Sequence, residues 1–265
     1  MKFEILTLFP EMFEVFNYSI IARAREKGLI EINTMNIRDF TTNKHKKVDD
    51  YPYGGGAGMV MQAEPIYNTV EYVEKKYGYK PFTILLTPRG KKYNQEEAKK
   101  LSNIKHIMLI CGHYEGLDER IMPLIDQEYS IGDFVLTGGE IASMVIVDTV
   151  SRLIPGVLST NVSYEDESYF NNLLEYPQYT RPEEFKGMRV PEVLLSGHHK
   201  NIERWRRYQS LKITYLRRPD LLERSKLSKD DIKMLNQIKD ELKNIEWFWM
   251  HIINRKICYD YLLSV

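Results

Sequence analysis

Three glycine-bearing loops follow apolar segments of this chain, and their residue types suit the binding of a ligand. They are Leu86–Gly90, Cys111–Gly116 and Ile131–Glu140. If the apolar segments are strands of one open α/β sheet, the loops meet beyond the carboxyl ends of the strands, where such sheets bind ligands. A pocket lined by main-chain donors and acceptors suits an adenine or another flat polar ring. The alternative is that each glycine merely ends a strand.

A fourth glycine cluster, Tyr53–Met59, has four glycines in five positions. Glycine permits close backbone approach and positive φ. The cluster is not a Walker loop, because no Gly-Lys-Ser/Thr follows, and it lacks the third glycine of a dinucleotide fingerprint. Two interpretations stay open: a ligand-contacting loop or a plain flexible turn.

A basic segment, Ser196–Lys226, holds nine Lys or Arg residues against three acidic ones. Its arginines Arg204, Arg206, Arg207, Arg217 and Arg218 are interleaved with Trp205, Tyr208 and Tyr215. Arginines beside exposed aromatic rings suit a phosphate backbone with unstacked bases, as in RNA loops. The alternative is a solvated helix face whose aromatic rings point into the core.

Composition excludes several classes of protein. The 265 residues are 43% apolar, and 37 basic side chains balance 37 acidic ones, so any nucleic-acid footprint must be local. The two cysteines, Cys111 and Cys258, form no metal or disulfide pattern and fit a reducing compartment. The start is not a signal peptide, and the longest apolar-rich run, Ile141–Val147, is far shorter than the roughly 18 residues that span a bilayer. We therefore expect a soluble, cytoplasmic protein without a metal site.

The elements that would position the loops alternate along the first 155 residues and predict an α/β domain with a parallel sheet covered on both faces. The predicted strands are Phe3–Phe9, Leu29–Ile37, Phe82–Leu86 and Ile107–Cys111. The predicted helices are Met12–Lys27, Pro65–Tyr77, Asn94–Leu101 and Glu140–Leu153.

The second part of the chain is different. Asn161–Glu175 carries four acids and no base, and it has no regular period, which is typical of a linker or lid. Gln178–Asn244 contains no convincing strand, and helices are predicted at His199–Leu216 and Ser228–Leu242, the latter with a Ser228/Asp231 capping box. The predicted domains are residues 1–160, a linker at 161–177, a helical domain at 178–246, and a tail of unknown role at 247–265.

Seven motifs in series resemble the bacterial tRNA (guanine-N1)-methyltransferases of the TrmD type, which belong to the SPOUT class. They are Thr7–Phe13, Val48–Gly56, Cys111–Gly116, Gly138–Glu140, Val150–Leu158, Tyr179–Pro182 and Pro191–Gly197. The resemblance runs from Met1 to Ile245. It implies a deep trefoil knot in the amino-terminal domain, a small helical carboxyl-terminal domain that binds tRNA, and a homodimer with the active site at the subunit interface.

The resemblance also implies the reaction and its site. S-adenosylmethionine would donate a methyl group to N1 of guanosine 37, immediately 3′ of the tRNA anticodon, with magnesium assisting. The residues that match the cofactor pocket, or fall in its last loop, are Leu86, Thr87, Pro88, Gly112, Tyr114, Glu115, Gly116, Ile131, Gly132, Asp133, Phe134, Val135, Leu136, Gly138 and Gly139. At Gly112 and Gly139 we expect a branched residue such as valine to abolish cofactor binding, because a Cβ would fill space that the ligand needs.

Guanine N1 carries a proton and becomes a good nucleophile only when a base removes that proton. The charge left on O6 can be stabilised by a guanidinium, and Arg152 matches the family's arginine in that role. The family's base is an aspartate; here Glu167 falls at its position, and a shift of one residue would place Asp166 there instead. Arg89, where relatives usually have glutamine, adds a cation beside the pocket.

Two alternatives to this function stay open. One is a SPOUT methyltransferase acting at another RNA site. The other is an RNA-binding protein that kept the fold and lost a competent base at Glu167.

Overall fold

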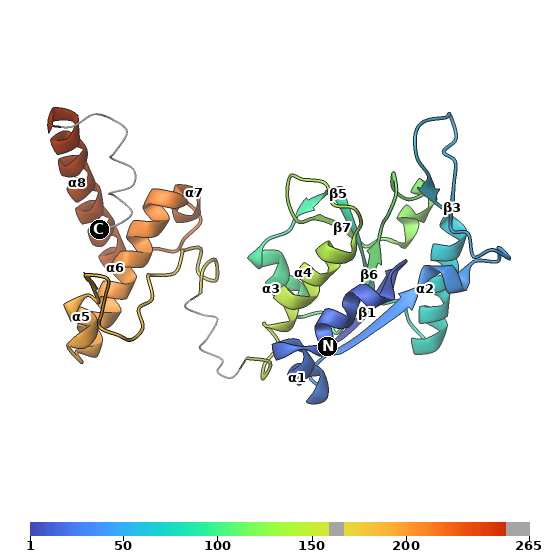
Figure 1. Cartoon of the computed structure of the whole chain (residues 1–265), viewed down its shortest axis with the longest axis horizontal. Coiled ribbons are helices and arrows are strands. Elements are labelled where there is room, and N and C mark those ends of the chain that lie inside the picture. Colours follow the sequence, from blue (N-terminus) through green and yellow to red (C-terminus); the bar gives the residue numbers. More distant parts are fainter. Residues whose placement is uncertain (159–166, 253–265) are drawn as a thin grey trace. The chain divides into compact units, whose positions relative to one another are not determined.

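The computed structural model describes residues 1–158 and 167–252, with side chains up to residue 243. The chain forms two compact units, Met1–Ser163 and Tyr164–Val265 (Figure 1). Within the described ranges, no helix combines the length and apolar character needed to cross a membrane.

The first unit is built on a five-stranded sheet in which all neighbouring strands are parallel, in the order β2-β1-β6-β5-β7. The strands are β1 (Lys2–Thr7), β2 (Glu31–Asn36), β5 (Phe82–Lys92), β6 (His106–Cys111) and β7 (Gln127–Ser130). The central strand β6 is buried along its whole length. Both faces of a parallel sheet are covered, so such a strand reads as a continuous apolar run, as the sequence predicts.

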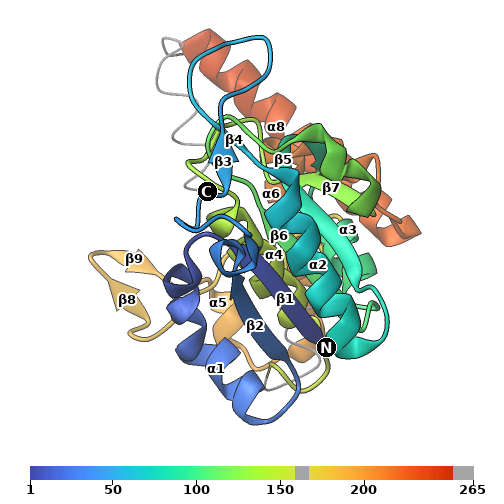
Figure 2. The same ribbon diagram turned by 90° about the vertical axis from the view of Figure 1, so that its right-hand side faces the viewer.

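Alternate residues of the strands feed two separate cores, because successive side chains point to opposite faces. On one face Ile107 and Leu109 pack with α1 (Ser19–Glu26), α3 (Gln95–Leu101) and α4 (Glu140–Ser151). On the other face Met108 and Ile110 pack against α2 (Ala63–Tyr77), and Figure 2 shows α2 and α4 on opposite sides of the sheet. The predicted α/β domain with both faces covered is confirmed. The trefoil knot is not visible in strand order and stays a prediction.

The predicted helix Met12–Lys27 is wrong as one element. A 3-10 helix, η1 (Pro10–Asn17), precedes α1, and the break falls at Ser19, whose φ is +59°. Phe13 and Phe16 are both buried in η1. Their spacing of three places both rings on the same side of the 3-10 helix, where they face the core.

Strand β5 is longer than predicted and is interrupted where the first glycine-bearing loop lies. Leu86 and Lys91 both pair with Tyr129 of β7, so the residues between them leave the ladder as a bulge. A bulge bends its strand and redirects side chains. Two short strands that the sequence did not predict, β3 (Asp49–Asp50) and β4 (Val60–Met61), pair around the glycine cluster.

The second unit is mainly helical, with α5 (Glu192–Leu195), α6 (His199–Arg217), α7 (Pro219–Leu222) and α8 (Lys229–Ile252). Its core consists of Leu173, Leu211, Leu235, Ile238 and Leu242. Because Leu173 belongs to this core, the part of the expected linker from residue 167 onward packs with the helices. The predicted capping box is confirmed, since Ser228 and Asp231 exchange side-chain and main-chain hydrogen bonds of 2.8 and 3.1 Å.

The expectation of no strand in Gln178–Asn244 is wrong. A small antiparallel hairpin joins β8 (Glu184–Phe185) to β9 (Met188–Arg189). Its two turn residues, Lys186 and Gly187, have φ of +54° and +78°. Positive φ at both positions is what a tight two-residue hairpin turn requires, but Lys-Gly between two-residue strands is a weak sequence signal.

Candidate active site

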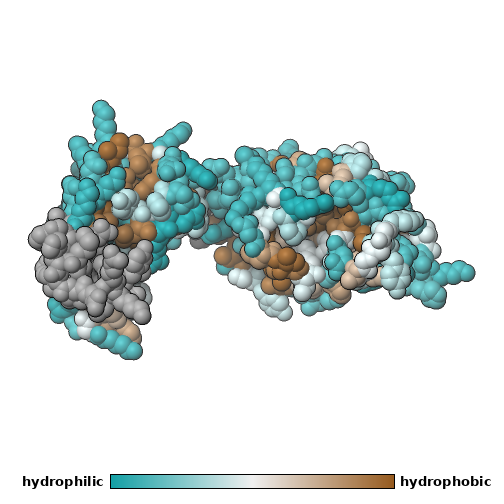
Figure 3. All heavy atoms as spheres, turned by 90° about the horizontal axis from the view of Figure 1, so that it is seen from above, coloured by the Kyte–Doolittle hydropathy of each residue, from teal (hydrophilic) through white to brown (hydrophobic). Residues whose placement is uncertain are grey.

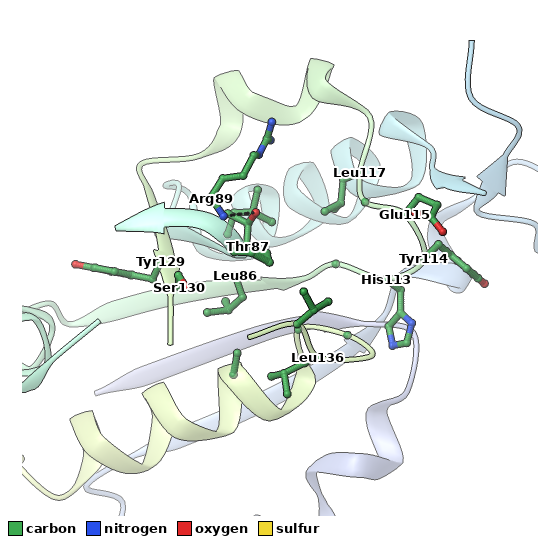
Figure 4. A pocket seen from close by; sticks show the side chains of 18 of the residues that line it. Leu86, Thr87, Arg89, His113, Tyr114, Glu115, Leu117, Tyr129, Ser130 and Leu136 are labelled. Atoms are coloured by element: carbon green, nitrogen blue, oxygen red, sulfur yellow. Dashed lines mark hydrogen bonds between the residues drawn. The ribbon is translucent and has the colours of Figure 1, made fainter. Parts of the chain in front are cut away.

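The three glycine-bearing loops converge on one cavity of about 490 Å³ at the bulge of β5 and the carboxyl ends of β6 and β7 (Figure 4). The expected cofactor residues that line it are Leu86, Thr87, Pro88, Gly112, Tyr114, Glu115, Gly116, Ile131, Gly132, Phe134, Val135, Leu136, Gly138 and Gly139. Figure 4 shows Leu86, Thr87 and Arg89 from β5, Tyr129 and Ser130 from β7, and His113, Tyr114 and Glu115 from the second loop around it. Apolar and polar side chains are therefore interspersed in the lining.

Asp133 is the exception among the expected cofactor residues. It is not among the lining residues, its side chain is 90% exposed, and it lies 3.3 Å from Nζ of Lys92. Position within a motif did not show which way this side chain would point.

Gly139 allows two of the loops to contact each other. Its N–H donates to the Gly112 carbonyl at 2.8 Å, and a Cβ built on Gly139 would lie 2.7 Å from the Cα of Cys111. A Cβ on Gly112 would instead meet a methyl of Leu117 at 2.6 Å. A Cβ at either position would thus meet the protein itself, and the expectation that it would also fill space needed by a ligand stays a prediction.

A buried carboxylate connects three of the motifs. Glu140, at the start of α4, is 1% exposed and accepts a hydrogen bond from Thr7 Oγ1 at 2.7 Å. Its other oxygen lies 3.2 Å from Nε2 of His113, and the N–H of Phe9 donates to the same Thr7 hydroxyl at 3.0 Å. A Cβ on Gly138 would overlap both His113 and Glu140. The network holds the end of β1, the second loop and the third loop in one arrangement.

The glycine cluster is attached to the second loop. Main-chain hydrogen bonds run from Glu115 N to Met59 O at 3.0 Å and from Met61 N to Gly116 O at 2.9 Å. Gly58 has φ +82°, and a Cβ there would clash with the Glu115 side chain. The interpretation as a plain flexible turn is therefore wrong for the end of the cluster, which packs behind the cavity wall.

A cation in the cavity lining and a buried thiol at the start of the second loop are already engaged. Arg89 pairs with Glu119 at 3.1 Å, and both side chains are about two-thirds exposed, so the pair is weak and screened by solvent. Burial raises the pKa of the Cys111 thiol well above its usual range, and Sγ lies 3.1 Å from Ser143 Oγ. Cys111 is a core residue and not a nucleophile.

The expected catalytic residues lie in different units. Arg152 caps the carboxyl end of α4 in the first unit. Glu167 lies in the second unit, where it lines a cavity of about 270 Å³ together with Arg206 and Arg207. Asp166 lies outside the described residues.

The five expected tRNA-binding arginines have different surroundings. Arg207 forms a two-pronged ion pair with Asp231, at 2.7 and 2.9 Å, and that aspartate is 5% exposed. Arg218 pairs in the same way with the exposed Asp220. The Arg206 guanidinium lies over the Tyr176 ring, 5.0 Å from its centroid. Arg204 and Arg217 are exposed.

Two of the aromatic residues between these arginines turn inward. Tyr208 and Tyr215 both pack against the helical core, and Tyr208 donates a hydrogen bond to Glu241. The ion pair with Arg207, with hydrogen bonds from Ser228, lowers the pKa of Asp231 to about 2. The alternative of a core-facing helix surface is thus correct for this part of the segment.

Among the described residues, no three His, Cys, Asp or Glu side chains gather in a group that could hold a metal ion.

Comparison with known proteins places this architecture in a family. The family profile described as tRNA (Guanine-1)-methyltransferase TrmD matches residues 1–224. A tRNA (guanine-N(1)-)-methyltransferase of Clostridium acetobutylicum is 60% identical over 236 residues, covering 89% of this chain and 97% of the relative. One from Clostridium novyi is 61% identical over 235 residues, with the same two coverages.

A solved structure has the same fold. The tRNA (m1G37) methyltransferase of Aquifex aeolicus superimposes with a TM-score of 0.69 at 44% sequence identity, covering 84% of this chain and 95% of that one. The profile covers most of the chain, and the relatives are matched almost over their full lengths. This chain therefore belongs to the tRNA (guanine-1)-methyltransferase family of the TrmD type.

Proposed function

We propose that this protein transfers a methyl group from S-adenosylmethionine to N1 of guanosine 37 in tRNA, in the cytoplasm. The observation that carries the proposal is the cavity where three glycine-bearing loops converge, in a chain about 60% identical to methyltransferases named for tRNA guanine N1.

The residues of the cavity fit S-adenosylmethionine. Its volume of about 490 Å³ is in the range of small-molecule sites. Leu86, Ile131 and Leu136 offer apolar surface for a purine ring. The main chain of the glycine-bearing loops also lines the cavity and can form hydrogen bonds with the polar edge of that ring. Glu115 places negative charge in the lining, which suits the positively charged sulfonium and ammonium groups, whereas Glu119 is paired with Arg89. The bound cofactor would supply a methyl group made electrophilic by its sulfonium.

The chain's own task is then to prepare guanine. A carboxylate must remove the N1 proton, and we assign this to Glu167, with Asp166 as the alternative one residue earlier. Arg152 would stabilise the charge that develops on O6. Since Arg152 and Glu167 belong to different units, bound tRNA and a second copy of the chain are proposed to bring them together around one guanine.

Exposed apolar side chains near the cavity support a homodimer. Phe134 and Val135 of the third loop are 55% and 84% exposed, and Ile141 and Val145 lie one turn apart on α4 with substantial exposure. Figure 3 shows hydrophobic surface among the hydrophilic side chains of both units. Contiguous apolar surface commonly marks a protein interface. We propose that a second copy covers the Phe134–Val145 surface, and that the amino-terminal unit is knotted as in the family.

The experiment is transfer of a tritiated methyl group from S-adenosylmethionine to an unmodified tRNA transcript. Transfer that disappears when guanosine 37 is changed to adenosine supports the proposal. Transfer that persists after this change indicates a methyltransferase for another RNA site. Tight tRNA binding without transfer indicates an RNA-binding protein that lacks a competent base.

A further inference from the structure

The helical unit contains a cavity of its own, of about 520 Å³, between the segment Tyr176–Arg181 and the amino-terminal half of α6. The side chains that matter here are Tyr176, Tyr179, Arg181, Ile202, Trp205 and Arg206, all of which line it. These residues all lie in one unit, so the geometry of this aromatic cavity is independent of where the first unit sits.

The aromatic rings of this cavity keep surface available. The ring centroids of Tyr179 and Trp205 are 6.3 Å apart, with the ring planes at 54°. Because the two rings are tilted, they do not cover each other's faces, and Tyr179 is 48% exposed. Arg206 adds a guanidinium plane on the Tyr176 ring. Aromatic rings and guanidinium planes are the groups on which unstacked nucleobases are held.

The arginines of this cavity differ from Arg207 and Arg218 in their ion pairing. Arg207 and Arg218 are held by carboxylates, whereas Arg181 and Arg206 form no ion pair within the described part of the chain. A guanidinium without a carboxylate partner is suited to bind phosphate. The one acidic side chain in the lining, Glu183, is exposed and can accept hydrogen bonds from amino groups of a base.

We propose that the aromatic cavity binds one unstacked nucleotide of the tRNA, with its base against Tyr179 and Trp205 and its phosphate against Arg181 and Arg206. The proposal rests on the proposed function, which makes tRNA the substrate. It adds a nucleotide-binding position outside the unit that holds the proposed cofactor cavity. It also assigns RNA contact on α6 to Trp205 and Arg206, in place of Arg207 and Tyr208.

The test measures the affinity of the full-length protein for an unmodified tRNA transcript over a range of salt concentrations. For Tyr179→Leu and Trp205→Leu, we expect the Kd for tRNA to rise about 10-fold or more, the scale of one lost base stack. The slope of log Kd against log salt should stay the same, because stacking releases no counterions. Arg206→Gln should instead reduce that slope by about the contribution of one phosphate contact.

Three controls isolate the cavity. Tyr72→Leu removes a tyrosine that is 50% exposed on α2 of the other unit, and tRNA affinity should not change. Trp205→Phe keeps a ring for packing and stacking, so it should retain most of the affinity that Trp205→Leu loses. The Kd for S-adenosylmethionine should be the same in every variant.

The outcomes separate this proposal from the proposed function. Wild-type affinity in both leucine variants, with tRNA methylation intact, overturns the aromatic cavity alone. Loss of the dimer in sedimentation, with weaker tRNA binding only as a consequence, means that the cavity is an interface between copies and also overturns it. A wild-type protein that neither binds nor methylates tRNA refutes both proposals.

Discussion

Glu140→Gln tests how the cavity of the three glycine-bearing loops is held together. The carboxylate at the start of α4 is buried and contacts both the end of β1, through Thr7 at 2.7 Å, and the second loop, through His113 at 3.2 Å. Glutamine has nearly the same shape, so no cavity forms. Its amide can still accept from the Thr7 hydroxyl, but its NH₂ group then replaces the carboxylate oxygen that faces His113 Nε2.

The expected loss follows from that single contact. Polar contacts to charged groups contribute about 1.5–3 kcal/mol, and the variant replaces the carboxylate beside the partly buried imidazole of His113 with a neutral amide. A loss of about 2 kcal/mol corresponds to a fall in Tm of roughly 4–8 °C for a unit of this size. If the network also preorganises the loops for S-adenosylmethionine, the same free energy appears as a rise in Kd of up to about 30-fold.

Calorimetric titration with S-adenosylmethionine and thermal melting of the same preparations measure both effects. Glu71→Gln is the matched control, because Glu71 makes only an exposed ion pair with Lys75 on α2, at 3.5 Å. That pair contributes a few tenths of a kcal/mol, so neither quantity should move measurably. If Glu140→Gln melts and binds cofactor as the wild type does, the buried network does not hold the loops, and the reasoning fails.

Three further expectations concern the base, a glycine and pH. Glu167→Gln should slow single-turnover methyl transfer about 100-fold or more, with little change in cofactor or tRNA affinity, and Asp166→Asn is its control. If Asp166→Asn is the damaging change and Glu167→Gln is mild, the base lies one residue earlier. Full activity in both variants would exclude a carboxylate base here. Gly139→Ala should lower Tm and reduce recovery of folded protein even without cofactor, since its Cβ would strike main chain; an unchanged Tm would contradict this packing. Burial lowers the pKa of His106, against the opposing charge of Glu4, so the unfolded chain binds the proton more readily. The neutral, buried His106 therefore contributes to the free energy of unfolding above about pH 6.5, and this contribution is lost as pH falls through that value. In denaturant titrations at pH 7 and pH 5, His106→Gln should lose less free energy of unfolding than the wild type. Equal losses in the two proteins would refute this role of His106.

The three glycine-bearing loops could be predicted because their sequence signals are local. An apolar run that ends in glycine marks both a buried parallel strand and the edge where its loop emerges, as in Ile107–Gly112. Strand β7 escaped prediction because Gln127–Ser130 is a polar edge strand in which only Tyr129 and Ser130 are buried. The link from Glu140 to His113 and Thr7 also escaped, because it joins residues up to 133 positions apart, and their contact depends on the tertiary fold.

Helix α6 shows why the basic segment could not be interpreted from its own sequence. The helical period places Trp205, Tyr208 and Tyr215 on one side, and the two alternatives for the segment were a core face or an RNA-binding face. In the structure, the two halves of this side of α6 pack against different segments. The carboxyl-terminal half packs against α8 and is core, with Leu211 fully buried, whereas the amino-terminal half meets the segment Tyr176–Arg181, which leaves a cavity. The covering elements lie far away in sequence, so the period of α6 can predict the face but not its neighbour. The core-facing alternative is therefore correct for the carboxyl-terminal half of the helix, and the RNA-binding alternative stays a prediction for the amino-terminal half. The arginines differ in the same way: Arg207 is bound to a buried aspartate, and Arg206, one residue earlier, lies on an aromatic ring without an acidic partner in the described part of the chain.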